Sequence, residues 1–230
     1  MSDLPSDGML DDTAASTGTS IHRFEHEAMA TTFGVTIAGQ KEAYAEEVAT
    51  AVFEELDRLE RELSRFVPSS DVACINRLRT GEHLSVSLAV YDCLKTAAWV
   101  YETTGGAFDV TIGPLVGFWR GKHSLSSEDE ARLEELRTRV GMDRLALHPN
   151  EPRVGAVGDE PGVDLGGIGK GYSLDEVAGL LADWGVTSAL IHGGQSTVLA
   201  GGGLPDGRGW PLALRHPHDP DQIFALISLA

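Results

Sequence analysis

The chain has 230 residues, which allows one or two domains and a sizeable buried core. Its 35 acidic residues outnumber its 18 lysines and arginines and give a formal net charge of −17. Nucleic acids and anionic membranes bind basic faces, so this charge argues against both as the main partner. No stretch has the apolar length of a membrane-spanning helix, and we expect no membrane segment.

Residues 1 to 20 are acidic and rich in Ser, Thr, Gly and Asp, with neither a basic start nor an apolar run. They do not resemble a secretion signal, so we expect a disordered tail ahead of one folded domain, residues 21 to 230. Cys74 and Cys93 have no CxxC spacing and no neighbouring histidine ligands. We therefore expect reduced, mostly buried thiols and a cytoplasmic setting.

Hydrophobic periodicity predicts strands and helices along most of the chain. Two strands come first, and a long amphipathic helix with one apolar face follows them. Gly105 and Gly106 end a second helix, and a capping pair, Ser127 and Glu130, starts a third. Paired turn signals near the end predict hairpins, so we expect an α+β fold with a mixed, largely antiparallel sheet packed with helices. The expected strands are residues 21–27, 32–38, 188–192, 197–200, 211–215 and 223–229, and the expected helices are residues 42–63, 87–103, 127–140 and a segment from residue 173.

Two irregular segments place aromatic side chains beside helix ends. A proline and several serines exclude a continued helix in residues 64 to 76. Phe66 lies in this segment, where it is either ordinary core or a platform for a stacked ring. A loop after the second helix carries Ala107, Phe108 and Asp109. Loops held by rigid elements commonly carry functional residues, so this loop is a candidate site.

Residues 163 to 171 combine one carboxylate, one ammonium group and four glycines. Glycine lets the backbone approach an oxyanion closely, while Lys170 can neutralise phosphate and Asp164 can orient a ligand. A Walker loop would need glycine at Asp164 and Ser or Thr at Gly171, and a dinucleotide fingerprint would need glycine at Tyr172. The segment matches neither motif. The glycines are also explained by a tight turn from a strand into a helix, and this interpretation is kept as an alternative.

The helix after this loop is expected to start at a capping box of Ser173 and Glu176, with its positive end toward the loop. A second glycine-rich turn, at Gly193 and Gly194, could meet the first turn in space.

The histidines do not predict a metal site. His22 and His26 are expected to be surface residues, because no further ligand is near in sequence. His216, His218 and Asp219 lie between prolines, and we interpret them as a plain turn.

Four segments, in this order, resemble the FAD:protein FMN transferases, the ApbE family. The likeness extends from about residue 22 to the end, and the joint order and spacing of the motifs are highly specific. The segments are Met-Ala-Thr-Thr-Phe (29–33), Leu-Ser-Arg-Phe (63–66) with Ile-Asn (75–76), Thr-Gly-Gly-Ala-Phe-Asp-Val-Thr-Ile-Gly-Pro-Leu-Val (104–116) and Val-Asp-Leu-Gly-Gly-Ile-Gly-Lys-Gly-Tyr (163–172).

The resemblance implies a magnesium-dependent enzyme that moves FMN from FAD onto a Thr or Ser of a flavin-acceptor protein and releases AMP. It implies that the backbone carbonyl of Gly167 is a magnesium ligand. Apolar and aromatic side chains suit a flat ring, and magnesium on the phosphates offsets charge on the leaving AMP. The implied FAD contacts are Met29, Phe66, Ala107, Phe108, Asp109, Asp164 and Lys170.

The chain also departs from the family pattern. Gly169 replaces the usual alanine, and His192-Gly-Gly-Gln-Ser replaces Asn-Leu-Gly-Gly-Asp. Family members continue further and supply an Asp and a Thr that ligate the metal, so we expect a C-terminally incomplete transferase domain. Three interpretations stay open: an active transferase that replaces these ligands, a non-catalytic FAD-binding or scaffold protein, and an inert fragment of a longer transferase. The sequence predicts neither the acceptor nor the oligomeric state.

Overall fold

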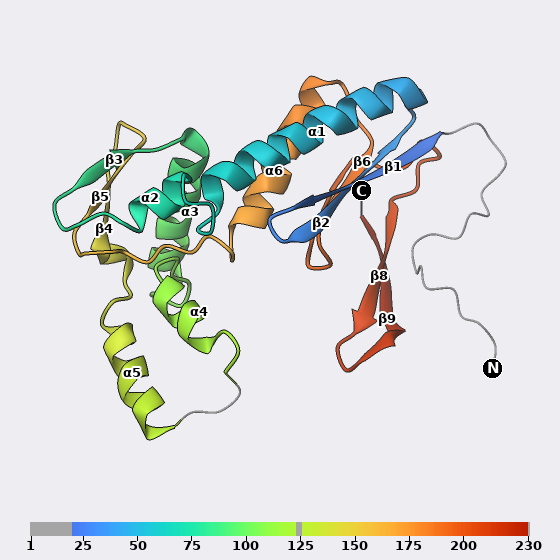
Figure 1. Cartoon of the computed structure of the whole chain (residues 1–230). Helices are drawn as coiled ribbons and strands as arrows, with labels where there is room; N and C mark the ends of the chain where they lie inside the picture. Colours follow the sequence, from blue (N-terminus) through green and yellow to red (C-terminus); the bar gives the residue numbers. More distant parts are fainter. Residues whose placement is uncertain (1–19, 123–125, 230) are drawn as a thin grey trace.

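The structure is a computed structural model that describes residues 20–122 and 126–229. The predicted tail lies outside the described residues except for Ser20. The described residues combine helices with antiparallel sheets, so the predicted α+β class is confirmed. Figure 1 shows two groups of elements joined by one long helix, α1 (Glu42–Leu63).

The first group is a four-stranded antiparallel sheet with helices on one face (Figure 1). α1 and α6 (Gly169–Asp183) pack together against it and bury a cluster that we call the sheet core. The strand order is β1 (Ile21–Ala28), β2 (Thr31–Ala38), β6 (Ala189–Gly193) and β7 (Thr197–Gly201). Fully buried members of the sheet core include Phe33, Ile37, Val48, Val52, Leu56 and Val177.

The second group surrounds α3 (Leu88–Thr103), which begins after Ser87, whose hydroxyl accepts a hydrogen bond from the Val90 N–H. The last turns of α1 enter this group and contribute to a second cluster, the helical core. Fully buried members of the helical core include Leu59, Val72, Ile75, Val90, Leu94 and Val163. Its other elements are α2 (Asp71–Ile75) and a three-stranded sheet of β3 (His83–Ser85), β5 (Arg153–Ala156) and β4 (Leu145–Leu147).

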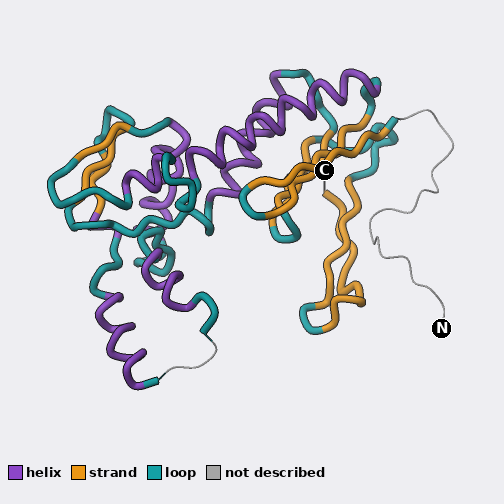
Figure 2. Tube along the Cα trace, in the orientation of Figure 1, coloured by secondary structure: helices purple, strands orange, loops and turns teal. Residues whose placement is uncertain are grey.

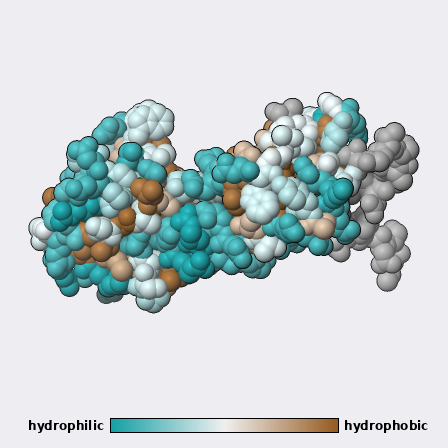
Figure 3. Space-filling view, turned by 90° about the horizontal axis from the view of Figure 1, so that it is seen from above, coloured by the Kyte–Doolittle hydropathy of each residue, from teal (hydrophilic) through white to brown (hydrophobic). Residues whose placement is uncertain are grey.

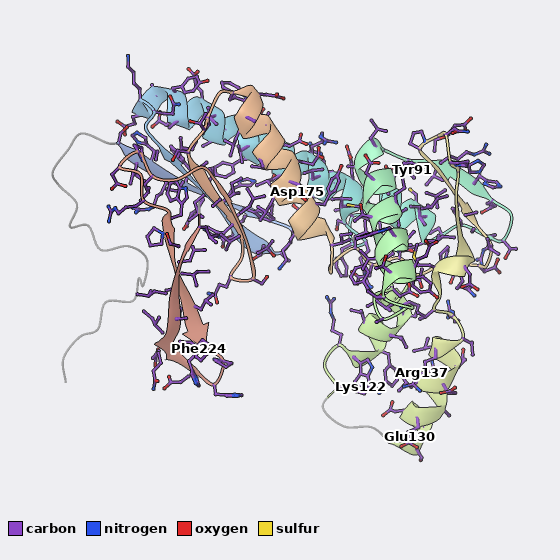
Figure 4. All side chains as sticks on the ribbon, turned by 180° about the vertical axis from the view of Figure 1, so that it is seen from behind. Tyr91, Lys122, Glu130, Arg137, Asp175 and Phe224 are labelled. Atoms are coloured by element: carbon purple, nitrogen blue, oxygen red, sulfur yellow. The ribbon has the colours of Figure 1, made fainter. Side chains whose placement is uncertain are left out.

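Two further helices, α4 (Gly113–Trp119) and α5 (Ser127–Arg137), extend from the helical group (Figure 2). A short 3₁₀ turn, Met142–Arg144, follows them. Lys122, after the end of α4, bonds to Asp129 of α5, and Figure 4 shows Lys122 beside that helix. α5 buries one residue, so its stability depends on its ends and its surface charges.

The remaining strands, β8 (Trp210–His216) and β9 (Asp219–Leu229), form a hairpin that projects from the sheet group (Figure 1). Its base is fixed by Trp210, which is 1% exposed and packs against Ala38 and Leu190. Its far part exposes large apolar side chains, including Phe224, which Figure 4 shows near the tip.

Several predicted boundaries were wrong. The segment predicted as irregular, residues 64 to 76, contains α2. The capping box of α5 is Ser126 with Asp129, one residue earlier than predicted. α6 begins at Gly169, so Ser173 lies inside the helix, where its hydroxyl donates to the Gly169 carbonyl.

No helix in the described ranges is both long and apolar enough to cross a membrane. Figure 3 shows a mainly hydrophilic surface on the face seen from above, with a narrow waist between the two groups.

Both cysteines are free thiols; Cys93 is buried as predicted, and Cys74 is half-buried.

Candidate functional site

The sequence motifs meet at the segment that leads into the glycine loop, which we define as residues 164 to 171. The side-chain amide of Asn76 pairs with both backbone groups of Val163: its Nδ2 donates to the Val163 carbonyl over 2.8 Å, and its Oδ1 accepts from the Val163 N–H over 2.5 Å. The next residue, Asp164, donates its backbone N–H to the Val110 carbonyl over 2.7 Å. The entry to the loop is therefore fixed from two distant parts of the chain.

Asp164 uses both carboxylate oxygens inside the protein. Its Oδ2 lies 2.7 Å from Nη1 of Arg65, and its Oδ1 accepts the Gly166 N–H over 2.8 Å. The Arg65 and Asp164 side chains are 20% and 16% exposed. Asp164 was predicted to orient a ligand; in the structure it shapes the glycine loop itself.

Lys170 lies in the first turn of α6 and lines an open pocket of about 440 Å³. Its Nζ lies 3.1 Å from the hydroxyl of Ser196, in the turn between β6 and β7. The expectation that the two glycine-rich turns meet in space is thereby confirmed. Other lining residues include Gly166, Gly167, Tyr172 and Asp175, and Figure 4 shows Asp175 on α6.

The pocket is lined by one basic and one acidic side chain, Lys170 and Asp175, beside the start of a helix. The start of α6 presents the positive end of a helix, and Lys170 adds an ammonium group there. Burial, and next the charge of Glu176, raise the pKa of Tyr172 above its usual value, so its phenol stays protonated.

Phe108 lies directly against the glycine loop. A Cβ atom at Gly167 would come within 3.2 Å of the Phe108 ring, so glycine permits this close approach. Asp109 turns away into its own loop, where Oδ1 accepts from the N–H and the hydroxyl of Thr111, each over 2.7 Å. Ala107, one residue before Phe108, is exposed.

Phe66 is 62% exposed, so its interpretation as ordinary core was wrong. The guanidinium carbons of Arg65 and Arg120 lie 5.0 and 5.1 Å from the centre of its ring. Cations at this distance are attracted to an aromatic face. The other interpretation, a platform for a stacked ring, agrees with this exposure.

Met29 reaches α6 from the turn between β1 and β2. Its backbone N–H donates to Oε1 of Glu60 over 3.0 Å, and its sulfur lies 3.6 Å from the Ser173 hydroxyl. Because Ser173 lies one turn beyond Lys170, Met29 is connected to the helix that carries the pocket lysine. Its half-buried side chain packs against both cores.

Phe108 lies against Gly167, and Gly167 lines one pocket with Lys170, but the residues that line this pocket include neither Phe108 nor Asp109. Met29 and Phe66 are connected to the loop through intervening residues. Sequence reasoning missed the supporting residues. Of these, Arg65, Asn76 and Thr111 stand within the quoted motifs, but no pattern in the sequence indicated their partners in the fold. The others are Glu60 and Ser196.

His26 was expected at the surface, but it is half-buried and bonds to Asp57 of α1 over 2.6 Å. His216 and Asp219 face each other across the hairpin turn, where a turn was predicted. In the described part of the chain, no group of three or more His, Cys, Asp and Glu residues could hold a metal ion.

The fold and the site define an α+β protein with a glycine-lined pocket that presents an ammonium group at the start of a helix. The sequence pattern of the ApbE family matches residues 29–230. The chain belongs to the ApbE family.

Two proteins named FAD:protein FMN transferase are similar to most of this chain. A FAD:protein FMN transferase of Klebsiella pneumoniae (strain 342) is 28% identical over 94% of this chain and 63% of its own length. One of Salmonella typhimurium (strain LT2) is 27% identical over 88% of this chain and 59% of its own length. The chain therefore spans about three fifths of the length of these relatives.

Solved structures share the fold. The flavin transferase ApbE from Vibrio cholerae superposes with a TM-score of 0.81 at 24% identity, over 92% of this chain and 69% of that chain. The ApbE protein from Thermotoga maritima superposes with a TM-score of 0.80 at 25% identity, over 91% of this chain and 68% of that chain.

Proposed function

We propose that this protein is a FAD:protein FMN transferase, which transfers FMN from FAD to a Thr or Ser hydroxyl of an acceptor protein in a magnesium-dependent reaction. The observation that carries the proposal is the position of Lys170, at the start of α6 in an open pocket walled by the glycine loop. Membership of the ApbE family and the names of its relatives support the same activity. A cytoplasmic setting remains a prediction.

Each predicted site residue has a proposed role toward FAD. Lys170 binds the diphosphate, because an ammonium group at a helix start opposes phosphate charge. Phe108 and the exposed Phe66 offer faces to flat rings, and Met29 adds an adaptable apolar contact. The remaining proposed contacts are Ala107 and Asp109, which border Phe108, and Asp164, which also shapes the loop.

Magnesium is proposed to bind at the backbone carbonyl of Gly167. Both Gly166 and Gly167 are exposed, so their backbone is open to an ion held by substrate phosphates. Magnesium in phosphate-binding sites commonly keeps several waters and takes few ligands from the protein. When bound, the ion would neutralise charge on the diphosphate, while Lys170 and the loop hold the substrate in place.

A second candidate function is FAD binding without transfer. One feature favours keeping it: the metal would have one predicted protein ligand, the backbone carbonyl of Gly167. An inert fragment would bind no FAD at all. The acceptor and the magnesium dependence are what separate transfer from binding.

Replacing Lys170 tests the proposal. We expect Lys170→Ala to weaken FAD binding about 10- to 100-fold, because a charge-assisted contact is worth about 1.5–3 kcal/mol. Fluorescence quenching of FAD measures the dissociation constant. Lys95→Ala is the matched control, since Lys95 is exposed on α3 and pairs with Asp92 of the same helix.

Transfer itself is measured by incubating the chain with FAD, magnesium and an acceptor protein and scanning a denaturing gel for covalent flavin fluorescence. A fluorescent acceptor band that needs magnesium supports the transferase. FAD binding without a band at any magnesium concentration supports the second candidate. Equal FAD affinity in the wild type and in Lys170→Ala would contradict the assignment of the pocket to FAD.

A further inference from the structure

Arg65 connects three segments that meet beside the glycine loop. It follows the end of α1, and its Nη1 lies 2.7 Å from Oδ2 of Asp164 and 3.3 Å from the carbonyl oxygen of Gly113. The side chains of the ion pair are 20% and 16% exposed. A pair this far from solvent is screened by salt less than a surface pair, and its geometry is better fixed.

The contact continues into the loop through Asp164. The second carboxylate oxygen of Asp164 accepts the backbone N–H of Gly166 over 2.8 Å. Gly166 is followed by Gly167, and both are exposed and line the pocket with Lys170. Arg65 therefore fixes the carboxylate on one side, and the carboxylate fixes the loop backbone on the other.

We propose that Arg65 is a positioning residue of the site, which acts through Asp164 to hold the glycine loop in its binding conformation. This inference rests on the proposed function. A loop rich in glycine has many accessible conformations, and ordering it at the moment of binding weakens affinity. Arg65 orders the loop before the ligand arrives.

The same guanidinium group also lies over the Phe66 ring, so loss of stacking must be separated from loss of the ion pair. Arg120 provides the matched control. Its guanidinium carbon lies 5.1 Å from the same ring, compared with 5.0 Å for Arg65. Arg120→Ala therefore removes a cation from Phe66 and leaves the pair of Arg65 with Asp164 intact.

The test measures FAD binding by fluorescence quenching in Arg65→Ala, Arg65→Lys, Arg120→Ala and Asp164→Asn. We expect Arg65→Ala to weaken FAD binding about 10-fold or more, because small misplacements of a binding group are costly. Arg65→Lys should recover part of the loss, since it keeps the charge but not the planar group. Arg120→Ala should change affinity less than about 3-fold, as expected for one exposed cation near a ring.

Two readouts separate positioning from general destabilisation. Added guanidinium at low, non-denaturing concentration should restore FAD binding to Arg65→Ala, whereas sodium chloride at the same ionic strength should not. Hydrogen exchange should become faster at the Gly166 amide in Arg65→Ala and remain unchanged in Arg120→Ala. Arg65→Ala combined with Asp164→Asn should weaken binding little more than either change alone, because both break one contact.

Failure of this inference is distinguishable from failure of the proposed function. If the wild type binds FAD and Arg65→Ala binds it equally well, Arg65 does not position the loop. An equal loss in Arg120→Ala would likewise overturn the inference, because stacking would then explain it. If the wild type does not bind FAD, the proposed function is wrong, and exchange at Gly166 alone decides whether Arg65 orders the loop. If Arg65→Ala does not fold, FAD affinity and exchange at Gly166 are compared between Arg120→Ala and the variants Arg65→Lys and Asp164→Asn.

Discussion

Met29 and Ala30 adopt left-handed backbone angles, with φ of 52° and 56°. Residues with side chains avoid this region, at a cost of about 1–2 kcal/mol each. Two-residue hairpin turns of type I′ need it at both central positions, which is why glycine and asparagine are common there. Here the turn instead places a methionine whose backbone N–H bonds Glu60 and whose sulfur approaches Ser173. The strain is located at a predicted binding residue.

Relieving this strain should stabilise the protein. We expect Ala30→Gly to raise the free energy of unfolding by about 0.5–1 kcal/mol, because glycine adopts positive φ freely. Ala28→Gly is the control: Ala28 is buried in β1, where glycine lowers stability. Urea denaturation monitored by tryptophan fluorescence measures both. Equal or reduced stability of Ala30→Gly would show that the turn is not strained.

Residue types in the sequence indicated the chemistry of the site better than its geometry. Lys170 and Phe108 were predicted from their neighbours in the chain, and both lie at the glycine loop. Asp164 was predicted to orient a ligand, but its pair with Arg65, almost a hundred residues earlier, was not predicted. Phe66 could be assigned neither to core nor to surface, because a single aromatic in a turn has no periodicity. Local sequence patterns do not indicate contacts between residues that lie far apart in the chain.

At the scale of elements, length and periodicity decided what the sequence could predict. α1 and α3 were predicted within one residue because each repeats apolar positions over several turns. β3, β4 and β5 were missed, since three or four residues are too few to show alternation. The start of α6 was missed because glycines and lysine there resemble a loop, while tertiary contacts make the segment helical.

The hairpin of β8 and β9 exposes more apolar surface than a soluble element normally does. Phe224 is 70% exposed and Leu226 is 75% exposed. Exposed apolar side chains promote association. We expect the double change Phe224→Thr with Leu226→Thr to reduce binding of a hydrophobic dye and self-association measured by sedimentation, with stability changed by less than about 0.5 kcal/mol.

Ile37→Thr is the control for that experiment. Ile37 lies in β2 and is fully buried, so the same kind of change should lower stability without a comparable reduction in dye binding. A large loss of stability in the hairpin variant would show instead that Phe224 and Leu226 pack against the rest of the chain.

At the scale of the whole molecule, α1 connects the two cores. Leu56 is fully buried in the sheet core and Leu59 is fully buried in the helical core, less than one turn later. A change at either position therefore acts on a helix that both groups share. We infer that the two groups unfold together.

Leu59→Ala tests this coupling. We expect it to lower the free energy of unfolding by about 2–5 kcal/mol, because it leaves a cavity in the helical core. Hydrogen exchange should then accelerate in β2, which belongs to the sheet group, as well as in α3. Faster exchange in α3 with unchanged protection in β2 would show that the groups are independent.

The continuity of α1 also has a consequence for ligand entry. Its 22 residues include no proline or glycine, and at 1.5 Å per residue they form a rod about 33 Å long. A rod embedded in both cores offers no hinge between them, so the groups cannot swing apart to admit a ligand. Ligand access to the pocket and ligand release must then depend on the turns at its rim.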